Sequence, residues 1–267
     1  MVYKVSLDYQ YSLQPRPRNV ALEKLLDKQV DAYCWRMLEM SSFAEGLKKI
    51  NRVEAADSIE PRWDNGNWIP CLDAASIYYL IGKQRPKIYM EVGSGNSTKF
   101  ARKAIKDFGL STRIVSIDPM PRAEVDTICD EVLRYPLEDV GVEVFDSLGQ
   151  NDVLFVDNSH RSFQNSDVTV FFTEILPRLK RGVVYGVHDM FLPDDYPADW
   201  ESRIYNEQYL MSAYLLGGHG GDEIFLPNWY IHTSDNQNLK ELREQIFSDP
   251  HYEGLNKVGT CFWLKRA

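Results

Sequence analysis

The chain lacks several features that would assign its 267 residues to a protein class at once. No apolar run approaches the roughly 18 residues of a membrane span, and MVYKVSLDYQ at the start has no signal-peptide apolar stretch. Basic residues are not in excess, because the net charge is −9, which opposes nonspecific binding to nucleic acids or anionic membranes. We therefore expect a cytoplasmic protein with no nucleic acid and no membrane among its partners.

Cysteine is scarce, and its spacing shows no regular framework. The four cysteines lie far apart and form no C-x-x-C pair: Cys34, Cys71, Cys129 and Cys261. Such isolated thiols are typical of reduced, partly buried residues. No internal repeat or low-complexity tract is present, and 44% hydrophobic with 26% charged residues is typical of a soluble globular protein.

The first part of the chain has a helical pattern. Between Val20 and Ile50 apolar residues recur at helical spacing, and Leu72–Ile81 predicts a further helix. We expect residues 1–86 to form an N-terminal helical extension, or cap, and residues 87–267 to form the main domain.

From residue 87 onward strand and helix patterns alternate, which predicts an α/β fold with a doubly wound, mostly parallel sheet. After the first strand we expect strands at 113–117, 142–145, 152–156, 182–187, 224–226, 230–232 and 258–264. Helices are expected at 99–108, 123–132, 166–179 and 200–216, the last with Asp199 as its N-cap.

The segment IYMEVGSGNST at 88–98 predicts a ligand site built from backbone. A strand stops at Glu91, Gly93 and Gly95 permit a tight turn, and the following helix begins with free N–H groups. Such a loop usually holds a nucleotide-like cofactor. Thr98 stands where the third glycine of a dinucleotide motif belongs, which weakens that interpretation and favours a cofactor without phosphates, such as S-adenosylmethionine.

A second acid lies where a ribose-binding residue is expected. Asp118 ends the second strand about 25 residues after Gly93, close to the roughly 20 residues typical of a βαβ nucleotide site. Asp118-Pro119 is also compatible with a plain turn, and the loop with an ordinary strand–helix junction.

At this point the chain resembles class I S-adenosylmethionine-dependent methyltransferases. The resemblance covers roughly residues 60–267 and is carried by EVGSGNST at 91–98, SIDP at 116–119, DVLFVDNSH at 152–160, LPRLKRGVVYGVHDMFLPDDYP at 176–197, NEQYL at 206–210 and GTCFWLKR at 259–266. It implies a Rossmann-like sheet of seven strands in the order 3-2-1-4-5-7-6, with GTCFWLKR as the antiparallel last strand.

The resemblance also implies residue roles. The methionine portion of the cofactor would lie against Glu91, Gly93, Ser94 and Gly95, the ribose against Asp118 and the adenine against Asp146. Asp157 is expected beside the sulfonium.

Polar side chains follow the fourth and fifth strands, where an open α/β sheet binds its ligands. Asp157, His160, His188 and Asp189 are the candidate catalytic residues. One hypothesis makes Asp157, His188 and Asp189 ligands of a divalent metal; the other, which we favour here, makes His188 or His160 a general base. Glu207 and the loop carrying Asp194 and Asp195 are further pocket candidates.

Three functions follow from these patterns. The favoured one is methyl transfer from S-adenosylmethionine to an oxygen or nitrogen of a small molecule. The alternatives are an NAD-type oxidoreductase and a noncatalytic cofactor-binding domain. Assembly into a homo-oligomer stays open.

Overall fold

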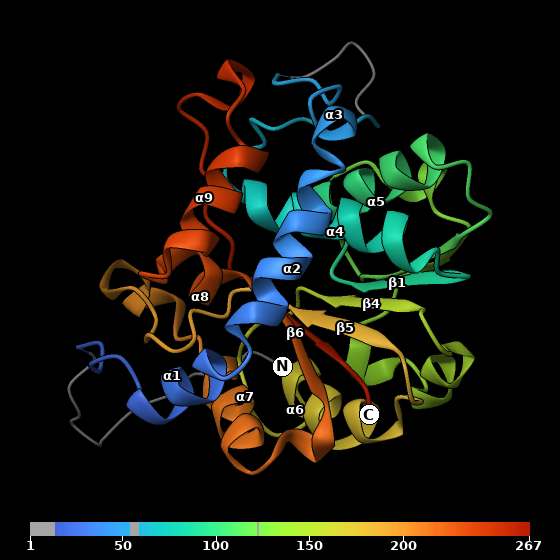
Figure 1. The fold of residues 1–267 in the computed structure, drawn as a ribbon. Coiled ribbons are helices and arrows are strands. Elements are labelled where there is room, and N and C mark those ends of the chain that lie inside the picture. The colour runs from blue at the N-terminus through green and yellow to red at the C-terminus, as the bar shows by residue number, and fades with distance from the viewer. Residues whose placement is uncertain (1–13, 54–58, 122) are drawn as a thin grey trace.

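The computed structural model of the chain describes residues 14–53, 59–121 and 123–267. It contains a sheet of seven strands surrounded by helices (Figure 1). The predicted extension is described only in part, because residues 1–13 and 54–58 lie outside these ranges. Its division from the main domain at residues 86 and 87 stays a prediction.

The sheet has the order β3-β2-β1-β4-β5-β7-β6. Its β1, β2, β3, β4 and β5 pair in parallel, and β7 pairs antiparallel with both β5 and β6. The strands are β1 (Ile88–Val92), β2 (Arg113–Ile117), β3 (Glu131–Leu133), β4 (Val153–Val156), β5 (Val184–Val187), β6 (Glu223–Pro227) and β7 (Phe262–Lys265). The predicted strand order and the antiparallel last strand are confirmed.

Helices cover the sheet and join its parallel strands. They are α1 (Val20–Asp27), α2 (Val30–Ser41), α3 (Ala44–Leu47), α4 (Cys71–Gln84), α5 (Asn96–Asp107), α6 (Asp167–Val170), α7 (Glu207–Leu216), α8 (Asn228–Thr233) and α9 (Gln237–Ile246). The α6 helix continues through a π turn, Phe171–Ile175, and a 3₁₀ turn that contains Pro177. No helix in the described ranges is both long and apolar enough to cross a bilayer.

The N-terminal helices share one core with the sheet. The α2 helix packs against α9, and α4 packs against α5 (Figure 1). In α4 every side chain from Cys71 to Ile81 is buried, so this helix is apolar all round apart from Asp73 and Ser76. A helix buried on all sides lies within a core rather than on it. The first turn of α4 brings Asp73 to His188, directly after β5.

Four local predictions are wrong. The third strand is β3 and not 142–145, which forms part of a 3₁₀ helix, Val142–Ser147. Residues 123–132, predicted as a helix, contain a 3₁₀ turn, Asp126–Ile128, and the start of β3. Residues 230–232 belong to α8, since Pro227 ends the pairing of β6. The helix predicted at 200–216 begins only at Glu207, because Ile204 is left-handed with φ of 55°. A short β-prone run forms a strand only where a neighbouring strand is available to pair with it.

Candidate active site

The ends of β1 and β4 meet so closely that one position requires glycine. Gly93 has φ of +80°, and a Cβ added there would lie 1.8 Å from the carbonyl oxygen of Asp157. Asp157 N–H donates to the Val92 carbonyl at 2.8 Å, which holds the two strand ends together. Only a residue without a side chain fits between them. Gly95 differs, since nothing lies within 4 Å of a Cβ built on it.

Glu91 and Thr98 brace this loop from beneath. Glu91 is fully buried; its carboxylate accepts from Tyr89 OH at 3.0 Å and from the Thr98 hydroxyl. Thr98 Oγ1 also accepts the Gly95 N–H at 3.0 Å, so the residue that replaces the third glycine holds the turn closed. Burial raises the pKa of Glu91 to about 7. The structure does not bring Glu91 to the cavity that Gly93, Ser94 and Gly95 line.

Asp118 joins the loop to the end of β2. Its two carboxylate oxygens accept backbone N–H groups from Ser94 and from Met120, each at 2.7 Å. Ser94 Oγ also hydrogen-bonds with Ser116 Oγ at 2.7 Å. The Asp118 carboxylate is half-buried and lines the cavity, so it has lone pairs left for a ligand hydroxyl.

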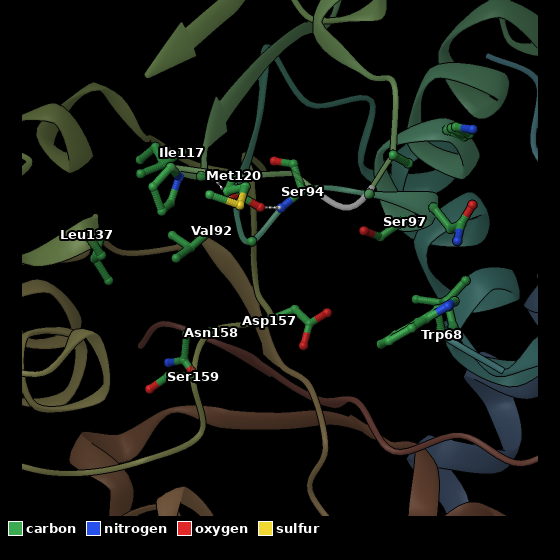
Figure 2. Close-up of a pocket in the computed structure, with 18 of the residues that line it drawn as sticks. Trp68, Val92, Ser94, Ser97, Ile117, Met120, Leu137, Asp157, Asn158 and Ser159 are labelled. Carbon is green, nitrogen blue, oxygen red and sulfur yellow. Dashed lines mark hydrogen bonds between the residues drawn. The ribbon is translucent and has the colours of Figure 1, made fainter. Parts of the chain in front are cut away.

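A cavity of about 730 Å³ opens above these strand ends, within the size range of ligand sites. Figure 2 shows Asp157 in the open centre, with Trp68 on one side and Asn158 and Ser159 on the other. Ser94 and Ser97 lie above it, and an apolar group made of Val92, Ile117, Met120 and Leu137 gathers at one end. The cavity therefore has an apolar end beside Asp118 and a polar centre at Asp157.

Asp146, the predicted adenine contact, is not brought to this cavity. Its carboxylate pairs with Arg178 at 2.5 Å, and its backbone carbonyl accepts from Lys180. The apolar lining at Ile117, Met120 and Leu137 stands where a base could stack instead.

The four predicted catalytic side chains come together at the ends of β4 and β5. His160 Nε2 lies 3.1 Å from Asp157 Oδ1 and 3.5 Å from Asp189 Oδ2. His188 Nδ1 lies 3.4 Å from Asp157 Oδ1 and 3.5 Å from Asp189 Oδ1. Of these four, in the part of the chain that is described, only Asp157 lines the cavity; the side chains of both histidines are 4% exposed.

Two buried carboxylates hold the histidines from behind. Glu207 Oε2 lies 2.9 Å from His160 Nδ1, and Asp73 Oδ2 lies 3.2 Å from His188 Nε2. Glu207 was a pocket candidate in the sequence, whereas Asp73 was missed. A lone acid within the apolar run LDAASIYYLI is the signal that could have found it. Asp73 also accepts the backbone N–H groups of Thr260 and Cys261, which fixes its position.

The backbone at two of these residues is left-handed. His160 has φ of 58° and Asp189 has φ of 56°, a conformation that costs free energy for residues other than glycine and clusters at functional sites. The Asn158 side chain accepts the His160 N–H at 2.8 Å, and His160 O accepts the N–H of Asn206 at 2.9 Å. These contacts tie the start of α7, and with it Glu207, to His160.

The charges of the cluster act on one another. Burial alone would lower the pKa of both imidazoles, but the surrounding carboxylates outweigh it and raise the pKa of His160 and His188 well above the ordinary value. Burial would raise the pKa of Asp157, yet His188 and His160 hold it below its usual range. Asp157 therefore stays ionised and pairs with either two imidazolium groups or another cation.

Comparisons with known proteins agree with this description. Residues 90–190 match a protein family described as a methyltransferase domain. No curated protein matches the chain. Among solved structures, the chain is similar to the S-adenosylhomocysteine-bound methyltransferase PaMTH1 of Podospora anserina, at 16% identity over 97% of this chain and 100% of that one, with a TM-score of 0.38. An O-methyltransferase from Bacillus cereus in complex with S-adenosylhomocysteine shares 13% identity over 92% and 96%, with a TM-score of 0.36.

The matched domain and the observed sheet define the class. The match spans the loop after β1, Asp118 and the whole Asp157–Asp189 cluster, and the strand order is the one expected of class I S-adenosylmethionine-dependent methyltransferases. The predicted enzyme class is thereby confirmed, and the NAD-type oxidoreductase is set aside.

Proposed function

We propose that this enzyme transfers the methyl group of S-adenosylmethionine to an oxygen or nitrogen atom of a small molecule. The observation that carries the proposal is that one cavity is lined by the Gly93–Ser97 loop, by Asp118 and by Asp157. Donor-binding backbone and a reactive polar centre therefore share a single space, which is what an in-line transfer between two bound molecules needs.

The donor fits the cavity from its apolar end. The adenine would stack against Ile117, Met120 and Leu137, and the ribose hydroxyls would donate to Asp118. The methionine portion would then lie along Ser94 and the first N–H groups of α5, where a helix N-terminus favours a carboxylate. Thr98, rather than glycine, is compatible with a donor that carries no pyrophosphate.

The acceptor would occupy the remaining space between Trp68 and Asn158. Trp68 is 58% exposed and presents its ring to the cavity, so a flat or apolar face of the acceptor can pack against it. The net charge of −9 disfavours a nucleic-acid acceptor. Together with the cavity volume, these features favour a small organic molecule with a hydroxyl or amine group.

In the transfer step the acceptor atom attacks the methyl carbon, a new bond to carbon forms and the carbon–sulfur bond breaks, leaving S-adenosylhomocysteine. The acceptor must also lose a proton. Asp157 is the group of the cluster that faces the cavity, and His160 Nε2 lies 3.1 Å behind it. A histidine base, the hypothesis favoured from the sequence, would have to start neutral and would receive the proton through Asp157, because neither imidazole lines the cavity.

The proposal is tested by calorimetric titration with S-adenosylhomocysteine. We expect one molecule to bind per chain, and Asp118→Asn to weaken binding about 10- to 100-fold through the loss of charge-assisted hydrogen bonds. An equal affinity for Asp118→Asn would remove its ribose role. A transfer assay with labelled S-adenosylmethionine and a panel of phenols, diols and amines then tests catalysis. Binding without transfer to any of them would favour the noncatalytic alternative.

A further inference from the structure

Three side chains at the ends of β4 and β5, those of Asp157, His160 and Asp189, are spaced as the ligands of one metal ion. For a tetrahedral ion with bonds of about 2.0–2.2 Å, neighbouring ligand atoms are separated by roughly 3.3–3.6 Å. His160 Nε2 lies 3.1 Å from Asp157 Oδ1 and 3.5 Å from Asp189 Oδ2. His188 Nδ1 lies 3.4 Å from Asp157 Oδ1 and 3.5 Å from the other carboxylate oxygen of Asp189, Oδ1. The facing atoms of Asp157, His160 and Asp189 all lie within 4.8 Å of one another.

One buried nitrogen supports this interpretation independently. His188 Nδ1 faces Asp157 and Asp189, yet it makes no hydrogen bond within the described part of the chain. The side chain is 4% exposed, so bulk water does not satisfy it. A buried polar atom without a hydrogen bond is costly and calls for an explanation, and a cation bound to Asp157 and Asp189, which this nitrogen faces, supplies one.

The groups behind the histidines also match a metal centre. Metal-binding histidines donate their second ring N–H to a carboxylate, which fixes the tautomer and the ring orientation. His160 has Glu207 in that position at 2.9 Å, and His188 has Asp73 at 3.2 Å. Both carboxylates are 0% exposed. The other ring nitrogens, Nε2 of His160 and Nδ1 of His188, are thereby turned toward the carboxylates of Asp157 and Asp189.

We propose that Asp157, His160 and Asp189 bind a divalent transition-metal ion of the Zn²⁺ type, with His188 Nδ1 beside the site. The ligand set differs from the one predicted from the sequence by having His160 in place of His188. An imidazole and two carboxylates suit Zn²⁺, Mn²⁺ or Fe²⁺, whereas Mg²⁺ prefers six oxygen ligands. Because Asp157 lines the cavity, a metal held here could polarise an acceptor hydroxyl; that role rests on the proposed function, but metal binding does not.

The alternative to a metal ion at this site is a pair of protons on the two histidines. Two imidazolium groups paired with Asp157 and Asp189 would also balance the cluster, without any metal. The two arrangements differ in metal content and in the response to added Zn²⁺, so they can be separated on the whole protein.

The experiment is a calorimetric titration of chelator-treated full-length protein with ZnCl₂ and, separately, with MgCl₂. We expect one Zn²⁺ per chain and no measurable binding of Mg²⁺ at the same concentrations. Asp189→Asn and His160→Asn should weaken Zn²⁺ binding at least about 100-fold. Asparagine is chosen because it tolerates the left-handed backbone at both positions. Wild-type protein that binds no Zn²⁺, or a variant that binds it as tightly as wild type, would overturn the proposal.

Matched variants separate this proposal from the donor site. Asp118→Asn removes a carboxylate from the same cavity but not from the cluster, so it should bind Zn²⁺ like wild type and S-adenosylhomocysteine weakly. Asp189→Asn should show the reverse, and its retained S-adenosylhomocysteine binding also shows that it is folded. Were both variants unfolded, titration of the wild type with Co²⁺ would decide: visible absorption bands of a low-coordinate Co²⁺ site are expected, and their absence would overturn the proposal.

Discussion

The two halves of the cavity are built in different ways. The half after β1 and β2 is made mainly from backbone: Gly93 lets two strand ends meet, and Asp118 is held by the N–H groups of Ser94 and Met120. The half after β4 and β5 is made from side chains: Asp157, Asp189 and two histidines that buried acids direct. The first half depends on shape, and the second depends on charge.

This difference decides what a mutation should do. A backbone site fails when the chain can no longer adopt its conformation, so steric changes there should affect folding and donor binding together. A side-chain cluster fails when one group loses its charge or orientation, so isosteric changes there should leave the fold and the donor site nearly intact. The predictions below break or sharpen this contrast, from the largest expected effect to the smallest.

Gly93→Ala should be the most damaging single change. The added Cβ meets backbone atoms of Asp157, which cannot turn aside, and φ of +80° is strained for alanine. We expect a loss of about 3 kcal/mol or more of unfolding free energy, measured by chemical denaturation, together with loss of donor binding. Gly95→Ala is the control, because its Cβ meets no atom within 4 Å. An equal loss in both variants would refute the close approach of β1 and β4.

Glu91→Gln should change how stability depends on pH. Burial raises the pKa of Glu91 from 4.5 to about 7, so the folded state favours the protonated acid. Its favourable contribution is complete below pH 4.5 and is lost as the pH rises through 7. By pH 8 the buried charge costs the wild type on the order of 3 kcal/mol, which the glutamine variant avoids. Unfolding free energies of both proteins at pH 5 and pH 8 test this; parallel curves would contradict it.

Glu207→Gln should weaken the metal site without removing a ligand. Glutamine keeps the size of the side chain but loses the charge that directs His160 Nδ1. We expect Zn²⁺ affinity to fall about 10- to 100-fold. Asp222→Asn is a matched control, since Asp222 is equally buried and pairs with Tyr185 and Arg266 outside the cluster. Zn²⁺ binding that falls equally in the control would show a general loss of stability instead.

Trp68→Ala should have the smallest effect on the fold. The ring is 58% exposed, so we expect a change in unfolding free energy below about 1 kcal/mol. Donor affinity should stay within about twofold, whereas KM for the acceptor should rise and kcat should change little. Trp68→Phe should restore most of the acceptor affinity. A loss confined to S-adenosylhomocysteine binding would instead place Trp68 on the donor.

The backbone half could be predicted well from the sequence. Gly93, Ser94, Gly95 and Asp118 lie where their local pattern indicated, because a strand–turn–helix junction is encoded within a few neighbouring residues. Glu91 was predicted to line the cofactor site, but the pattern does not tell on which face of β1 its side chain lies. It faces Tyr89 and Thr98 beneath the loop.

The side-chain half could be predicted only in part. The sequence indicated that Asp157, His160, His188 and Asp189 converge, because parallel strands end at one edge of the sheet. It could not indicate which acids stand behind them. Asp73 is separated from His188 by 115 residues and Glu207 from His160 by 47, so their pairing follows from packing of α4 and α7 and from no local pattern.

A crystal structure of the complex with S-adenosylhomocysteine tests the central claim most directly. We expect the adenosine beside Leu137, its ribose hydroxyls within hydrogen-bond distance of Asp118, and its sulfur turned toward Asp157 and the open space beside Trp68. A ligand bound elsewhere, or an adenosine with no contact to Asp118, would contradict it.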